Sequence, residues 1–100
     1  MYVIFAEVKP ANGSRHQKDG HIGAVVTCYI NYQDIDGAYA LAKYYIEEEE
    51  WEVIEFEEEY YHLDNLEDVE DEYHQYYQEA LEGGYSIIFN VYDWNEGYFE

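Results

Sequence analysis

The sequence predicts an α+β fold in which a four-stranded sheet and two helices form a two-layer sandwich, in the order ββαβαβ and with both helices on one face. Four segments are rich in β-branched and aromatic residues in alternating or continuous apolar runs, which is typical of strands. Two further segments carry apolar residues at three- and four-residue spacing, which places them on one side of a helix. No linker or internal repeat interrupts this order, so residues 1–100 are expected to form a single domain.

The first two strands are expected at residues 2–9 and 22–32. The first ends before Pro10, which has no backbone N–H to donate to a sheet, and the second is rich in Val, Thr, Tyr and Ile. The connection at residues 11–20 is polar and contains glycine. The pattern therefore predicts an antiparallel hairpin with a long loop.

The first helix is expected after Asp34 or Asp36, because either carboxylate can accept a hydrogen bond from the first backbone N–H groups. Its apolar side comprises Ile35, Ala38, Ala42, Tyr45 and Ile46. The helix ends in four consecutive glutamates, residues 47–50. Each carboxylate close to a helix C-terminus costs about 0.3–1 kcal/mol because the helix dipole is negative there. The sequence thus breaks a local stability rule at this helix end.

The third strand is expected from Trp51 to Tyr60, half-buried, with an acidic outer edge or face. Alternation predicts Ile54, Phe56 and Tyr60 on the inner side. The same alternation places Glu55, Glu57 and Glu59 on the outer side, where a regular strand would space them about 6.6 Å apart. Such a spacing predicts a row of charges comparable with successive phosphates of a DNA strand.

The second helix is expected to start at a capping box formed by Asp64 and Glu67 and to end at the double glycine of residues 83–84, which supplies a left-handed turn. Its apolar positions are Leu66, Val69, Tyr73, Tyr76 or Tyr77, and Ala80. Residues 85–92 form a continuous apolar run, which predicts a last strand in the centre of the sheet. Residues 93–100 are expected to form a flexible tail.

The central part of the chain resembles a family of small uncharacterised bacterial proteins. The residues that carry the resemblance are Ala38, Ala42, Ile46, Trp51, Val53 and Glu55, followed by the segment 76–83. In that family a helix leads into a Gly-Trp-x-Val strand, and a later helix ends in a Gln-Ala-Leu-x-x-Gly pattern. Glu50 stands here in place of the glycine before the tryptophan. The resemblance implies a compact α/β fold and no particular activity.

The charge of the chain is distributed unevenly. Residues 1–43 hold four acids and four bases, whereas residues 44–100 hold twenty acids and no Lys or Arg. Like charges at close range raise the free energy of a compact state, so folding alone does not explain this segment. Adaptation of the whole proteome to high salt is one explanation of an acidic surface. It would acidify residues 1–43 as well, and because these residues are neutral, that explanation is weakened. A net charge of −20 also repels nucleic acid and anionic membranes, so direct binding to either is not expected.

Features that the sequence lacks constrain the cellular location of the protein and the chemistry that it can carry out. A single cysteine, Cys28, cannot form an intrachain disulfide, and neither a secretion signal nor a run of about 18 apolar residues is visible, which together predict a cytoplasmic protein. The histidines lack zinc-type spacing, and the acidic fragments at residues 34–37 and 64–68 do not complete a calcium loop. Hydroxyl nucleophiles are scarce, and Cys28 falls in mid-strand, where a thiol usually acts as a small buried apolar group. We therefore expect no metal, no cofactor and no enzymatic activity.

The acids and tyrosines together favour a non-enzymatic protein that binds a basic protein surface. Tyrosine is enriched at protein interfaces and can stack on arginine. The predicted partner is a nuclease or another nucleic-acid-handling protein, engaged in the style of DNA-mimic inhibitors such as anti-restriction, anti-CRISPR or immunity proteins. The candidate contact residues are Glu47, Glu48, Glu49, Glu50, Glu55, Glu57, Glu59, Tyr61, Glu67, Glu70 and Asp71.

Two alternatives stay open. The chain can be a soluble bacterial protein of another role, whose acidity only serves solubility. The basic residues Lys9, Arg15 and Lys18 can also dock on the acidic face of a second copy, so the oligomeric state is open and includes a dimer.

Overall fold

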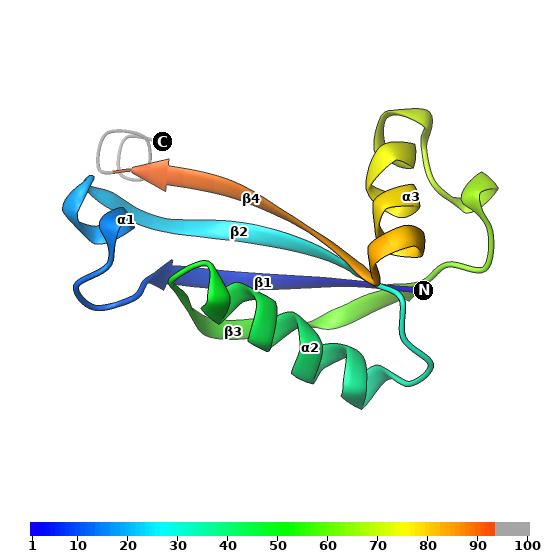
Figure 1. Cartoon of the computed structure of the whole chain (residues 1–100), viewed down its shortest axis with the longest axis horizontal. Helices are drawn as coiled ribbons and strands as arrows, with labels where there is room; N and C mark the ends of the chain where they lie inside the picture. The colour runs from blue at the N-terminus through cyan, green and yellow to red at the C-terminus, as the bar shows by residue number, and fades with distance from the viewer. Residues whose placement is uncertain (94–100) are drawn as a thin grey trace.

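A computed structural model describes residues 1–93 and confirms the α+β fold class (Figure 1). Within these residues the strands of the sheet are β1 (Tyr2–Pro10), β2 (His21–Ile30), β3 (Trp51–His62) and β4 (Tyr85–Asp93). The two main helices are α2 (Ile35–Glu48) and α3 (His74–Gly83). A short helix, α1 (Arg15–Lys18), and two 3-10 turns, η1 (Leu66–Asp68) and η2 (Asp71–Tyr73), lie in the connections. The predicted tail begins inside β4, and its remaining residues, 94–100, lie outside the described part of the chain.

The four described strands run in the order β3-β1-β2-β4, and every neighbouring pair is antiparallel. The hairpin of β1 and β2 is confirmed and forms the centre of the sheet. The central position predicted for β4 is wrong, because β4 lies at the edge beside β2. Its apolar run has another cause: Ile87 and Phe89 pack against the core on one face of the sheet, and Ile88 packs against the core on the other face.

The main core lies between α2 and one face of the sheet, and these two layers form the predicted sandwich. Even-numbered residues of β1 and β2 supply the sheet side of this core: Ile4, Ala6, Val8, Ala24, Val26, Cys28 and Ile30. Ala38, Ala42 and Ile46 of α2 are fully buried against them, as the helical spacing predicts. The carboxylate of Asp34 caps the helix by accepting a hydrogen bond from the Gly37 N–H at 2.8 Å.

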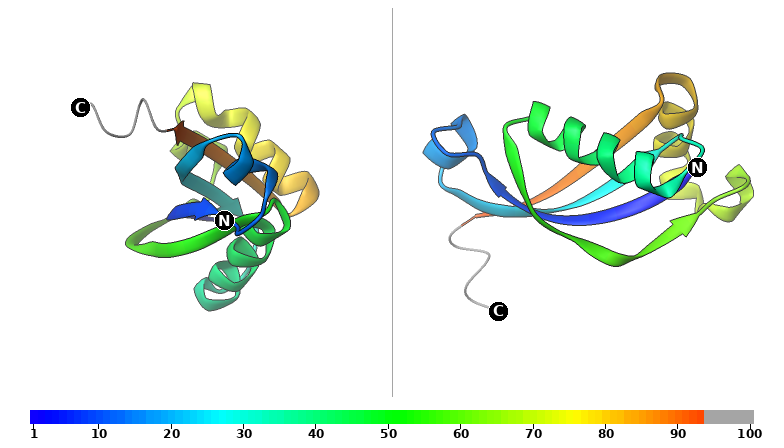
Figure 2. Two further views of the ribbon diagram at one scale, coloured as in Figure 1. Left: turned by 90° about the vertical axis from the view of Figure 1, so that its left-hand side faces the viewer. Right: turned by 90° about the horizontal axis from the view of Figure 1, so that it is seen from below.

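Helix α3 packs on the opposite face of the sheet, which corrects the prediction that both helices share one face (the left view of Figure 2). A second, smaller core forms there around Val3, Tyr29 and Ala80. The physical reason is that Val3, Phe5 and Tyr29, which are odd-numbered residues at one end of the central hairpin, are apolar or aromatic as well, so this end of the second face needs cover. The other end carries Glu7 and Lys9, and α3 lies over the apolar end only (Figure 1).

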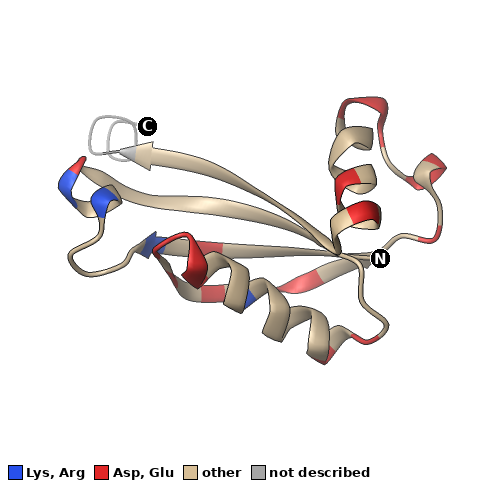
Figure 3. Ribbon diagram, viewed as in Figure 1, with Lys and Arg blue, Asp and Glu red and all other residues tan. Residues whose placement is uncertain are grey.

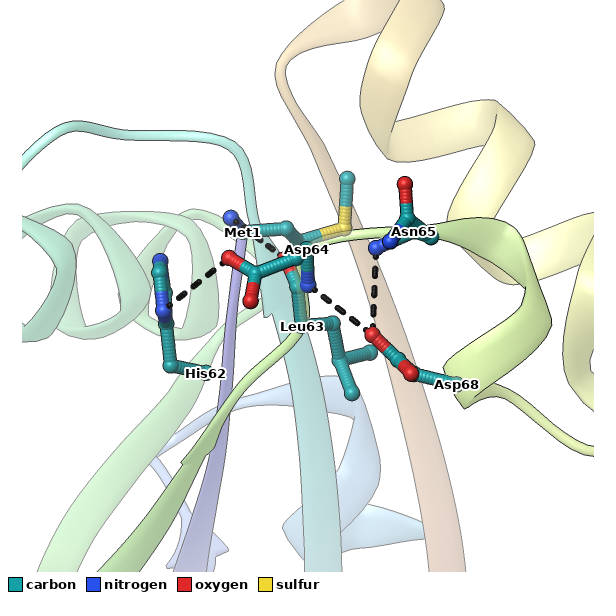
Figure 4. Close-up of polar contacts among 6 residues, drawn as sticks. All are labelled: Met1, His62, Leu63, Asp64, Asn65 and Asp68. Atoms are coloured by element: carbon teal, nitrogen blue, oxygen red, sulfur yellow. Dashed lines mark hydrogen bonds and ion pairs between the residues drawn. The ribbon is translucent and has the colours of Figure 1, made fainter.

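Helix α3 also begins later than predicted, at His74, and the 3-10 turns η1 and η2 precede it. The cap at this place is not the predicted pair of Asp64 and Glu67. The carboxylate of Asp68 accepts hydrogen bonds from the backbone N–H groups of Asp64 and Asn65, both at 3.2 Å (Figure 4). This carboxylate satisfies the N–H groups of a tight turn, so the chain bends there before the α-helix starts.

Candidate functional site

The glutamates of residues 47–50 lie at the end of α2 and in the turn that leads to β3, and all four are exposed. Glu50 has a φ of 65°, in the left-handed region. A residue with a Cβ atom loses roughly 1–2 kcal/mol in this conformation, and glycine does not. The left-handed backbone is a physical reason for the glycine that the family resemblance implies at this position. Glu50 is thus a second unfavourable local choice at the same turn.

Helix α1 holds the backbone of this turn. The His16 Nε2–H donates a hydrogen bond to the Glu49 carbonyl oxygen at 2.9 Å, and the His16 ring stacks on Trp51 with centroids 4.3 Å apart. The Ala11 N–H donates to the Glu50 carbonyl oxygen at 3.0 Å. The backbone carbonyl oxygens of Glu49 and Glu50 therefore accept hydrogen bonds within the fold, while the glutamate side chains stay exposed.

Strand β3 pairs irregularly with β1. Phe56 and Tyr60 are four residues apart, but their partners in β1, Ala6 and Ile4, are only two apart. The glutamates of residues 57–59 therefore occupy the length of a single residue of β1. A second shift in register lies between the partners of Glu55 and Val53. Strand β3 thus contains bulges at two places.

These bulges overturn the predicted alternation. Ile54, expected on the inner side, is 54% exposed, because the additional residue changes which positions of β3 face the core. Phe56 packs against the α2 side as predicted, and Trp51 and Val53 pack there with it. The regular row predicted for Glu55, Glu57 and Glu59 is likewise absent within the described strand. These glutamates surround a shallow hollow of about 320 Å³ together with Glu58 and Phe56.

The register also brings Glu7 directly opposite Glu55 on the neighbouring strand, and both are exposed. Like charges in this position destabilise a sheet. No pattern in the sequence indicates this pair, because Glu7 belongs to the neutral part of the chain and only the pairing of β1 with β3 brings the two together. Two residues further along β1, Lys9 lies opposite Glu52, and these two form the only Lys or Arg ion pair within residues 1–93, with an N–O distance of 4.0 Å.

Acids and bases occupy different regions of the molecule (Figure 3). The bases lie in α1, at the end of β1 and in the middle of α2, whereas the segment from η1 through α3 carries acids and no Lys or Arg. Every Asp and Glu between residues 44 and 92 is exposed. We call the exposed acids of residues 47–59, together with Glu7, the acidic edge.

A cleft of about 630 Å³ lies on the α3 face of the sheet, and no sequence pattern indicates it. Its floor includes Val3, Phe5, Tyr29 and Ile88 of β1, β2 and β4. Its walls come from the end of β3, from the segment that leads into α3 and from α3 itself; they include Tyr61, Tyr73 and Tyr76, with the acidic residues Asp68 and Glu70. We call this site the tyrosine cleft.

The tyrosines of the cleft are arranged in two groups. Tyr76 stacks on Tyr29, with ring centroids 6.2 Å apart, and lies 6.4 Å from Tyr73. Across the cleft, Tyr61 meets the ring of Phe5 edge-on at 5.8 Å. Tyr61 is 54% and Tyr73 is 43% exposed, while Tyr29 is buried. The inner rings therefore form a fixed base, and the outer two leave aromatic surface open to a ligand.

The electrostatic field in the cleft is negative. Glu72 raises the pKa of Tyr73, and partial burial and Glu70 raise it further. Burial raises the pKa of Tyr29, and the neighbouring hydroxyls of Tyr73 and Tyr76 add to the effect. The negative charges of Glu72 and Glu70, which oppose a phenolate at Tyr73, favour a cation at the same place, whereas the burial at Tyr29 opposes a charge of either sign.

The backbone around the cleft is fixed from two sides. At the end of β3, the Leu63 N–H donates to the Met1 carbonyl oxygen at 2.8 Å. The Met1 amine in turn donates to the Leu63 carbonyl oxygen at 3.2 Å (Figure 4). On the α3 side, the His74 Nε2–H donates to the Val69 carbonyl oxygen at 2.7 Å. The cleft thus has a preorganised frame although much of its wall is irregular chain.

The predicted contact residues do not form one site. Tyr61 and Glu70 line the tyrosine cleft together, and Glu67 and Asp71 lie close by in η1 and η2. The glutamates of residues 47–50 lie at the opposite end of the sheet, and those of β3 lie between the two ends (Figures 1 and 3). The structure therefore separates the glutamates of residues 47–50 from the tyrosine cleft, and the acidic edge runs along β3 from these glutamates towards the cleft.

Cys28 and the histidines contribute no reactive cluster in the described chain. Cys28 is fully buried, as its mid-strand position predicts, and burial raises the pKa of its thiol to about 12. Within residues 1–93 no group of three or more His, Cys, Asp or Glu side chains is placed to hold a metal ion. None of the helices described there combines the length and the apolar character that crossing a membrane requires.

Comparisons of the chain with protein-family models, with curated proteins and with solved structures found no match. The resemblance to the small bacterial family therefore stays a prediction. The functional argument rests on the acidic edge and the tyrosine cleft.

Proposed function

We propose that this chain is a non-enzymatic binding protein that engages a basic surface of a protein partner, and that the partner handles nucleic acid, as a nuclease does. One observation carries the proposal: every acid between residues 44 and 92 is exposed, and within residues 1–93 only Glu52 pairs with a lysine or arginine. A basic partner would neutralise this charge. The mode of action is that of a DNA-mimic inhibitor of the anti-restriction, anti-CRISPR or immunity type.

The positions of the acids favour binding over solubility alone. Solubility requires charge on the surface, but it does not require Glu7 opposite Glu55 or a glutamate at the left-handed position of Glu50. Each of these choices lowers the stability of the free protein. A partner with Lys and Arg side chains at the same surface would compensate for the repulsion, and long-range attraction would accelerate association.

The bulges of β3 restrict the form that mimicry can take. Residues 57–59 are crowded into a short length of strand instead of repeating at a phosphate-like interval. The proposed recognition therefore depends on the local density of charge and not on a regular spacing. A cleft lined by several basic side chains suits such a surface better than a groove that reads a straight row.

The test uses the partner captured from the native host and a pair of matched variants. Glu57→Lys with Glu59→Lys reverses two charges on the acidic edge, and Asp19→Lys with Glu82→Lys reverses two exposed charges elsewhere. We expect the first variant to weaken binding at least about tenfold, because close charge pairs across an interface contribute more than about 1.4 kcal/mol. The second variant should change the affinity by less than about threefold.

Salt provides the second readout. The affinity of the unmodified protein should fall as sodium chloride rises to about 0.15 M, where the Debye length is about 8 Å. An affinity that does not depend on salt, or that survives reversal of Glu57 and Glu59, would overturn the proposal and favour the solubility alternative.

A further inference from the structure

The composition of the tyrosine cleft selects for a cation with an apolar or planar body. None of its lining residues is a Lys or an Arg, its floor is mostly apolar, and its mouth carries the carboxylates of Asp68 and Glu70. An anionic ligand would meet these charges without a compensating base. A second copy of the chain, with a net charge of −20, would be repelled as well.

The two carboxylates at the mouth are not equivalent. One oxygen of Asp68 already accepts hydrogen bonds from the N–H groups of Asp64 and Asn65, so Asp68 serves the turn. Glu70 is exposed, and its backbone is tied to Tyr73, because the Tyr73 N–H donates to the Glu70 carbonyl oxygen at 2.9 Å. Glu70 and Tyr73 therefore present a carboxylate and an aromatic ring from one turn of chain.

We propose that the tyrosine cleft binds the guanidinium group of an arginine side chain from the basic partner, with Glu70 as its ion-pair partner and Tyr73 and Tyr61 as its aromatic contacts. This inference rests on the proposed function, since it names the partner side chain that the cleft accepts. Arginine fits better than lysine for two reasons. Its planar group stacks on an aromatic ring and pairs bidentately with a carboxylate, and it is more weakly hydrated than an ammonium group.

The volume and lining of the cleft, which encloses about 630 Å³, support the same occupant. An arginine side chain has an apolar stem that can lie along the floor formed by Val3, Phe5 and Ile88 while its charged end remains at the mouth. The stacked pair of Tyr29 and Tyr76 limits how far the group can enter. The cleft is therefore expected to hold one arginine together with part of the adjoining peptide.

The test uses three short peptides of equal length in which one central residue is Arg, Lys or citrulline. Binding to the full chain is measured by calorimetry and by NMR of the tyrosine rings. We expect the Arg peptide to bind about 3- to 10-fold more tightly than the Lys peptide, given the range of cation–π contributions, and the citrulline peptide to bind most weakly. The largest shifts should occur at Tyr61, Tyr73 and Tyr76.

Variants locate the site. Tyr73→Phe keeps the aromatic face and should retain the preference for arginine, whereas Tyr73→Leu keeps the bulk and should remove it. Glu70→Gln should lower the affinity for the Arg peptide about 3- to 10-fold. The controls are Tyr44→Ala, an exposed tyrosine of α2, and Glu82→Gln, an exposed acid of α3, and neither should change the preference.

The outcomes separate this inference from the proposed function. Equal binding of the Arg and Lys peptides, or the absence of shifts at Tyr73 and Tyr76, would overturn the assignment of the cleft, while the salt-dependent binding of the partner and its loss on reversal of Glu57 and Glu59 would still stand. Loss of the arginine preference in Tyr73→Leu but not in Tyr73→Phe supports the cleft assignment. Failure of the natural partner to respond to salt would overturn the proposed function even if the peptide results hold.

Discussion

Replacing Glu50 by glycine should stabilise the protein, because Glu50 has a φ of 65°. Removal of the Cβ atom relieves roughly 1–2 kcal/mol of left-handed strain, and the greater freedom of glycine in the unfolded chain offsets roughly 0.5–1 kcal/mol of that gain. Loss of a carboxylate near the C-terminus of α2 adds about 0.3 kcal/mol. The expected net gain for Glu50→Gly is about 1 kcal/mol.

The gain can be measured by urea unfolding and by thermal unfolding. For a chain of this size, about 1 kcal/mol corresponds to a rise of roughly 4–8 °C in Tm. Glu49→Gly is the matched control, because it removes the same charge from the adjacent position, where φ is −89°. Without strain to relieve, Glu49→Gly should lower the stability or leave it nearly unchanged, since glycine costs conformational entropy.

The comparison of Glu50→Gly with Glu49→Gly shows whether a gain in stability comes from relief of backbone strain or from loss of a charge. If both variants raise Tm equally, the gain comes from charge and not from the backbone. If Glu50→Gly lowers the free energy of unfolding, the left-handed geometry of the turn is refuted. In either case the claim that Glu50 carries left-handed backbone strain would be lost.

Three further predictions concern stability. Added sodium chloride should raise Tm, because screening reduces the repulsion among exposed acids within roughly one Debye length, about 8–10 Å. In urea unfolding, Ile46→Ala should lower the free energy of unfolding by about 2–5 kcal/mol, since Ile46 is fully buried, whereas Ile54→Ala at the bulge should lower it by less than about 1 kcal/mol. The free energy of unfolding should fall as the pH rises above about 9, the ordinary pKa of the thiol, because the pKa of Cys28 is raised to about 12 in the folded state and the unfolded chain loses the proton first. Urea unfolding across this pH range should show a shallower fall for Cys28→Ala.

Each of these predictions has a contrary result. A Tm that falls with moderate salt would show that the acids are compensated locally. Equal losses in Ile46→Ala and Ile54→Ala would contradict the bulged register of β3. A fall in stability above pH 9 that is identical with and without Cys28 would assign the alkaline effect to other groups, such as the tyrosines.

The parts of the fold that were predictable are those specified by local signals. The cap at Asp34 and the buried side of α2 at Ala38, Ala42 and Ile46 follow from residues close together in the chain. The hairpin of β1 and β2 follows from two β-rich segments on either side of a polar loop. In each case the energy that decides the structure comes from neighbours within a few residues or from an adjacent strand.

The parts that failed depend on which distant segments meet. A run of glutamates gives no periodic signal for a bulge, so the register of β3 is set by its pairing with β1. The side of the sheet that α3 covers could not be inferred, because both faces of the central hairpin carry apolar residues. The tyrosine cleft joins Phe5, Tyr61 and Tyr73, which only the complete topology brings together.

The bulges and glutamates of β3 also have a consequence for assembly. Strand β3 is an edge of the sheet, and an edge with unpaired backbone groups is a template on which another chain can add a strand and begin to aggregate. Irregular pairing and charged side chains both prevent this addition. A lysine side chain on an edge strand prevents strand addition as a glutamate does. Reversal of Glu57 and Glu59 to Lys therefore changes the sign of the surface charge without making the edge prone to aggregation.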